Sequence, residues 1–101
     1  MANMTLLGLT LPEARTMLAM SHHLPRDHAI ACLSDPKDGL FAQVVREGSG
    51  VVAAVARVNG HLALLDFDRC LDGASGRYEA IEDVVNALRL SLAEPGPGPY
   101  H

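Results

Sequence analysis

The sequence predicts an α+β fold: a four-stranded antiparallel meander with an N-terminal and a C-terminal helix, in the order α-β-β-β-β-α. Three observations predict it: helical spacing of apolar residues near both ends, four strand-like runs between them, and short turn sequences that join the runs. The chain has 101 residues, so we expect one folded domain, residues 1–93, and a flexible Pro/Gly tail, residues 94–101.

The first helix is predicted over about residues 11–21. Thr10 and Glu13 have the spacing of a capping box, and Pro12 lies in the first turn, where a missing N–H is tolerated. An apolar stripe at helical spacing follows, made of Leu11, Ala14, Met17 and Leu18. Pro25 prevents the helix from continuing into the connector that follows.

The four strands are predicted over residues 28–34, 40–47, 51–58 and 61–67. Asp-Pro-Lys-Asp-Gly at 35–39 and Gly-Ser-Gly at 48–50 are turn sequences. Asn59-Gly60 indicates a two-residue type I′ hairpin, because both positions tolerate a positive φ. A polar loop over 68–76 is expected to lead into the last helix, about 77–93, whose apolar stripe consists of Ile81, Val84, Val85, Leu88 and Leu92.

The Asn59-Gly60 turn also predicts the register of its hairpin, and both faces of that hairpin are apolar. One face would carry the pairs Val58–His61, Ala56–Ala63, Ala54–Leu65 and Val52–Phe67; the other would carry Arg57–Leu62, Val55–Leu64 and Ala53–Asp66. A half-solvated antiparallel sheet normally has one polar face. Either one helix covers each face, or an apolar surface is left for a partner. On the second reading, we expect the interface to consist of Val51, Val55, Arg57, Leu62 and Leu64.

Composition excludes several classes of function. The 8 basic and 12 acidic residues give a net charge of −4, and the last third of the chain supplies the excess acid. One lysine and few aromatic residues argue against nucleic-acid binding. No stretch approaches the roughly 20 apolar residues of a membrane helix. The two cysteines are expected to be free thiols in a reducing, cytoplasmic setting.

Residues 68–79 resemble an EF-hand calcium loop at four positions: Asp68, Asp72, Gly73 and Glu79. The resemblance implies a divalent-cation module that uses the three carboxylates, Asp68, Asp72 and Glu79. Cys70 stands where another oxygen ligand belongs, and the preceding element is a predicted strand instead of a helix.

The apolar run that ends in Asp66-Phe-Asp68 is also similar to the first motif of haloacid-dehalogenase-type phosphatases, which implies an aspartate nucleophile. Too little chain follows to build the large parallel sheet of that family.

A third chemical hypothesis concerns Cys32 and His28, which share strand parity and could form a thiol-dependent or small-ligand site. The apolar run around Cys32 indicates a core position, where a thiol is inert. No complete catalytic set is present and no cofactor is predicted. The leading hypothesis is therefore a small, non-enzymatic protein-binding module of inhibitor, immunity or adaptor type. It is expected to bind a protein partner or itself, as a homodimer, through the sheet.

Overall fold

The computed structural model describes residues 8–68, 71 and 75–92. Its elements, in chain order, are α1 (Leu11–Ala19), the short 3₁₀ helix η1 (Met20–His23), β1 (His28–Asp35), β2 (Gly39–Arg46), β3 (Gly50–Val58), β4 (His61–Asp66), β5 (Gly76–Tyr78) and α2 (Ile81–Leu92). The strands pair in sequence order and every pair is antiparallel. The predicted α+β class and its meander are confirmed. The predicted tail, 94–101, lies outside the described residues.

The sheet has five strands instead of the predicted four. The additional strand, β5, lies where the sequence suggested the start of the last helix, and it pairs Tyr78 with Leu62 and Arg77 with Ala63. It supplies backbone partners to the outer edge of β4, which would otherwise be left unpaired. The last helix consequently begins at Ile81, four residues later than expected from 77.

The hairpin between β3 and β4 has the predicted register over the six pairs from Val58–His61 to Ala53–Asp66, whereas the predicted pair Val52–Phe67 is not part of the ladder. Asn59 and Gly60 have φ angles of 53° and 83°, as a type I′ turn requires, and Val58 lies opposite His61. One irregularity was not predicted: the β2–β3 register shifts between Val44 and Val45. This β-bulge turns Val52 into the core, where it is fully buried, instead of onto the face of Ala54.

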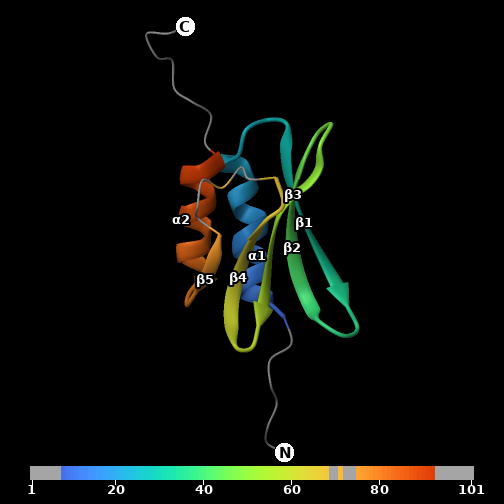
Figure 1. Ribbon diagram of the computed structural model, residues 1–101, viewed down its shortest axis with the longest axis vertical. Coiled ribbons are helices and arrows are strands. Elements are labelled where there is room, and N and C mark those ends of the chain that lie inside the picture. The colour runs from blue at the N-terminus through green and yellow to red at the C-terminus, as the bar shows by residue number, and fades with distance from the viewer. Residues whose placement is uncertain (1–7, 69–70, 72–74, 93–101) are drawn as a thin grey trace, which may run out of the picture.

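Both helices cover the same face of the sheet, and the other face carries no helix (Figure 1). The core lies between the helices and the sheet; its largest fully buried side chains are Met17, Val44, Val52, Val55, Leu62, Leu64, Leu71, Val84 and Leu88. The stripe predicted for the last helix is confirmed, since Ile81, Val84, Leu88 and Leu92 are buried. In α1, Ala14 and Met17 are buried as predicted, but Leu11 and Leu18 are exposed.

The start of α1 is joined to the sheet through one carboxylate. The predicted capping box is present: the backbone N–H of Thr10 donates to Oε1 of Glu13 at 2.9 Å, and the N–H of Glu13 donates to Oγ1 of Thr10 at 3.2 Å. The same Glu13 carboxylate binds Arg57 of β3, with Nη2 at 2.7 and 2.6 Å from its two oxygens. Arg57 also donates from Nε to the carbonyl oxygen of Gly8 at 3.1 Å.

Gly8 and Leu9 lie against the beginning of β2. The N–H of Leu9 donates to the carbonyl oxygen of Leu40 at 2.8 Å, and Gly8 forms a parallel bridge with the same residue. Gly8 has a φ of 77°, and a Cβ atom there would stand 2.4 Å from the oxygen of Leu40. This close backbone approach therefore depends on glycine.

Among the described residues, no helix combines the length and apolarity needed to cross a membrane.

Candidate functional site

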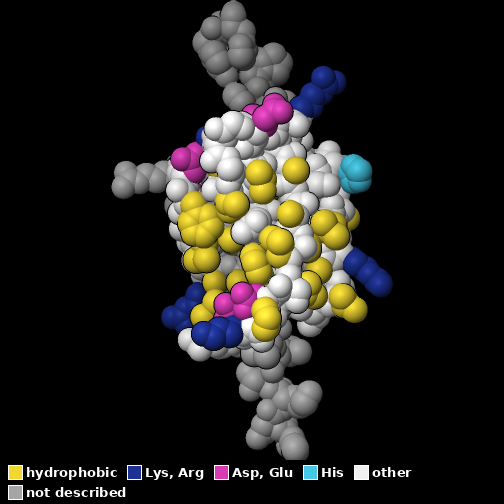
Figure 2. Space-filling model, turned by 90° about the vertical axis from the view of Figure 1, so that its right-hand side faces the viewer, with side chains coloured by type: hydrophobic (Ala, Val, Ile, Leu, Met, Phe, Trp, Pro, Cys, Tyr) yellow, Lys and Arg dark blue, Asp and Glu magenta, His cyan; other side chains and the backbone are white. Residues whose placement is uncertain are grey.

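The candidate site is the sheet face that carries no helix, which we call the open face. Its side chains alternate along the strands with those of the core, and they are mostly apolar: Leu33, Phe41, Gln43, Val51, Ala54, Ala56, Val58, Ala63, Leu65 and Phe67. Figure 2 shows this face as a broad apolar surface with charged side chains at its margins. Phe67 is 57 % exposed, Val58 49 % and Leu65 42 %. Contiguous exposed apolar surface of this kind usually marks a site of interaction.

The relief of the open face follows from the sizes of its side chains. On this face, the middle of β3 carries two small side chains, Ala54 and Ala56. The strands on either side of it carry large ones, Phe41 on β2 and Leu65 on β4. The alanine methyls therefore form the floor of a shallow hollow of about 380 Å³. Its lining residues are Asp35, Asp38, Phe41, Gln43, Ala54, Ala56, Arg57, Val58, Leu65 and Phe67. We call the strip over the two alanines the alanine trough.

Charged groups lie at the margins of the open face. At the turn between β1 and β2, Oδ1 of Asp35 accepts from the backbone N–H groups of Lys37 at 2.7 Å and Asp38 at 3.2 Å, so that this side chain is occupied in shaping the turn. The neighbouring Asp38 carboxylate has no ion-pair partner among the described residues. Arg77 of β5 lies at the opposite edge, beside Ala63, and likewise forms no ion pair within the described part of the chain.

The interface residues predicted from the sequence lie mostly on the other face, and the prediction is corrected here. Val55 and Leu62 are fully buried beneath the helices, and Leu64 is 1 % exposed. Arg57 is held at the edge of the core by the carboxylate of Glu13 and by the backbone carbonyl of Gly8. Of the five, only Val51 is exposed. Both helices lie on the face of Leu62 and Leu64, and burial of these two leucines stabilises the fold by removing their apolar area from water.

The open-face residues that sequence reasoning placed on the covered side are Leu65, Val58 and Phe67, together with Ala54 and Ala56. The signal that could have identified them is Arg57. Because Arg57 is charged, its face of the strand can be mistaken for the solvent-facing side. Glu13, the acid of the capping box in the first helix, pairs with Arg57 and so allows this face to lie under the helix. An arginine on the core-facing side therefore indicates a partner on the helix that covers it.

Of the three carboxylates of the EF-hand-like loop, the structure describes Asp68 and Glu79. Asp68 is bound to Arg46 at 2.7 Å, and Glu79 is exposed next to β5; Asp72, with Cys70 and Gly73, lies outside the described residues. No group of three metal-ligating side chains occurs within the part of the chain that is described.

Asp66, the nucleophile implied by the phosphatase-like motif, accepts hydrogen bonds from the backbone N–H groups of Asp68 and Leu71, each at 3.2 Å. Its carboxylate therefore helps to order the chain after β4.

Cys32 and His28, the two residues of the thiol hypothesis, do not form a site in the structure. Cys32 points to the helix side of β1, where its sulfur lies 3.8 Å from the carbonyl oxygen of Ala14. Burial raises the pKa of the Cys32 thiol, which lowers the fraction of reactive thiolate at neutral pH. His28 lies four residues away along the strand, about 13 Å at the usual rise. Its Nδ1 lies 2.8 Å from Oδ1 of Asp27.

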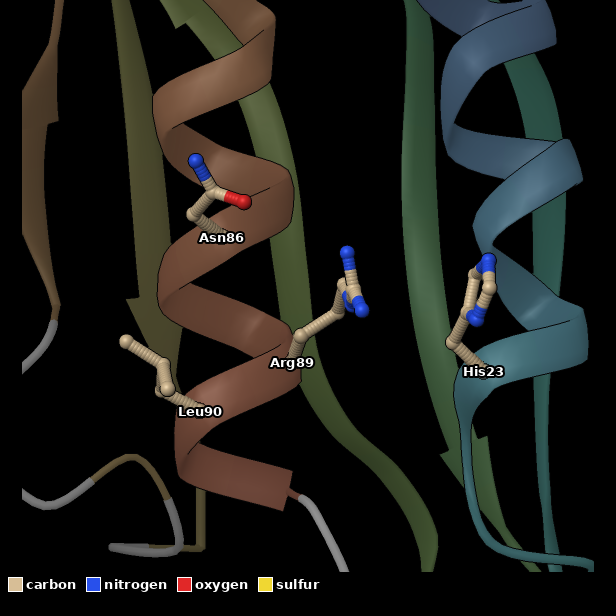
Figure 3. Close-up of a pocket in the computed structure, with 4 residues that line it drawn as sticks. All are labelled: His23, Asn86, Arg89 and Leu90. Atoms are coloured by element: carbon tan, nitrogen blue, oxygen red, sulfur yellow. The ribbon is translucent and has the colours of Figure 1, made fainter.

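A second hollow lies between η1 and α2 and has a volume of about 570 Å³. Figure 3 shows Arg89 extending from α2 into the gap, with His23 on its far side and Asn86 and Leu90 on the helix surface. All four of these side chains are exposed, so nothing shields a small ligand from water there. The open face is the stronger candidate.

No protein-family model, curated protein or solved structure matches this chain. The case for a function therefore depends on the geometry of the molecule.

Proposed function

We propose that this protein is a protein-binding module, of inhibitor, immunity or adaptor type, and that the open face is its docking surface. The observation that carries the proposal is the exposure of Val58, Leu65 and Phe67 on one continuous surface that neither helix covers. Keeping a large apolar side chain in water forgoes about 1.5–3 kcal/mol relative to burying it. A partner that covers several of these side chains recovers that free energy.

The chemistry of the face also favours a protein over a small molecule. Its hollow is shallow, its floor is built from alanine methyls, and its middle offers one side-chain amide, Gln43, for directional hydrogen bonding. Small-molecule sites are usually concave and enclose most of the ligand. An apolar centre with charges at the rim is instead the usual anatomy of a protein–protein interface.

The test compares binding by the full chain and by two lysine variants. Phe67→Lys places a charge on the open face, whereas Leu90→Lys changes a residue that is 84 % exposed on α2, away from that face. Circular dichroism first verifies that both variants fold. We expect any protein captured by the wild-type chain, a second copy included, to be lost with Phe67→Lys and kept with Leu90→Lys. Equal capture by all three chains would overturn the proposal.

A further inference from the structure

We propose that the partner of the open face is a second copy of this chain, packed face to face about a two-fold axis that runs along the strands between β3 and β4. This inference rests on the proposed function and names its partner. Three features of the face lead to it: its relief, the placement of its charges, and its size.

The relief of the face is self-complementary under this symmetry. Leu65 of β4 lies directly opposite Ala54 of β3, so the two residues are at the same height along the strands. A two-fold axis between these strands stacks β4 of each copy over β3 of the other and preserves that height. Each Leu65 then enters the alanine trough of the second copy, and the contact occurs twice. Sheets that pack face to face lie about 10 Å apart, a distance that suits a large side chain opposite a small one.

The marginal charges become paired under the same operation. The axis stacks β5 of one copy over β2 of the other. Arg77 then lies near the β1–β2 turn of the second copy, where Asp38 has no ion-pair partner among the described residues. A two-fold axis perpendicular to the strands would instead stack β5 on β5 and β2 on β2, which would leave Arg77 and Asp38 at opposite margins of the interface. Pairing Arg77 with Asp38 of the second copy therefore requires the axis along the strands.

The size of the face fits a weak dimer. The stacked strands β2, β3, β4 and β5 are 8, 9, 6 and 3 residues long. At about 3.3 Å per residue and about 4.8 Å between strands they cover roughly 400 Å² per copy, or roughly 800 Å² in total. This lies at the low end of specific interfaces. The association is thus expected to depend on concentration within the range that sedimentation can cover.

The experiment measures the molar mass of the full chain by analytical ultracentrifugation from about 5 to about 500 µM. We expect it to rise from the monomer mass of 10.7 kDa toward twice that value. Leu65→Lys should weaken the dimer at least about tenfold, because it places a charge in an alanine trough, whereas Leu90→Lys should leave the dissociation constant unchanged. Circular dichroism confirms that each variant folds.

The orientation is tested by exchanging charges. Arg77→Asp and Asp38→Arg should each weaken the dimer about threefold to tenfold, and the double variant should regain most of the loss. A wild-type chain that remains a monomer at about 500 µM, or a dimer that tolerates Leu65→Lys, overturns the inference. Failure of the double variant to recover overturns the proposed axis. If the wild-type chain is a monomer but captures another protein, and Phe67→Lys abolishes that capture, the dimer is refuted and the docking function of the open face is supported.

Discussion

Glu13 is the residue on which three parts of the molecule converge. Its carboxylate accepts from the Thr10 backbone and from Arg57, whose own Nε reaches the carbonyl of Gly8. Burial alone would raise the pKa of this carboxyl group. The hydrogen bonds from Arg57 and Thr10, together with the positive charge of Arg57, outweigh that effect and lower the pKa below its usual value of 4.5.

We therefore expect Glu13→Gln to reduce the free energy of unfolding by about 1.5–3 kcal/mol at pH 7, as measured by urea denaturation. The lowered pKa sets the sign of the pH dependence: the stabilisation is complete above about pH 4.5 and is lost as the pH falls through the folded-state pKa. The gap between the wild type and the variant should shrink at acid pH. Glu47→Gln, at an exposed turn position, is the control. A gap that is constant with pH would contradict this account.

Gly8 permits the first described residues to lie against β2. Gly8→Ala should lower the free energy of unfolding by more than about 2 kcal/mol, since it adds a clash with the Leu40 backbone to the cost of a positive φ. Gly48→Ala is the matched control: its φ of 85° is similar, but a Cβ there meets nothing within 4 Å. It should cost only about 1 kcal/mol. If chemical denaturation shows that the two variants lose equal free energies of unfolding, the contact between Gly8 and the Leu40 backbone does not require glycine.

At the scale of elements, the first helix depends on its cap. Thr10→Ala removes the acceptor for the Glu13 N–H and should cost about 1 kcal/mol in thermal or urea denaturation. Thr16→Ala is the control within the same helix. Its hydroxyl only donates to the carbonyl of Pro12, one turn back, so its loss should change stability by less than about 0.5 kcal/mol. Similar losses for the two variants would mean that the cap does not stabilise the helix.

The elements that could be predicted from the sequence are those with local signals. The capping box at Thr10, the Asn59-Gly60 turn and the apolar stripe of α2 each determine a conformation within a few residues, and all three are present. β5 could not be predicted in this way. It is three residues long, and only its pairing with residues of β4 that lie 12 to 16 positions earlier in the chain makes it a strand. The bulge at Val52 likewise arises from the fit between two strands.

At the scale of the whole molecule, the sequence left one question open: which face of the sheet the helices would cover. Both faces of the β3–β4 hairpin are apolar, so strand alternation could not distinguish core from surface. Side-chain size does not distinguish them either, because Leu65 and Phe67 are exposed on the open face whereas Ala53 is buried. The ion pair between Arg57 and Glu13 is the contact that ties one face to the first helix. The existence of a surplus apolar face was thus predictable, but its residues were assigned to the wrong side.

The one-sided placement of the helices has a consequence for how this chain can vary. Along β4, neighbouring positions obey different rules: Leu62 and Leu64 are enclosed, whereas Ala63 and Leu65 project from the bare side. When a systematic library is selected for folding alone, polar replacements should therefore be lost at positions 62 and 64 and retained at positions 63 and 65. A chain built in this way can acquire a different recognition specificity without rebuilding its interior.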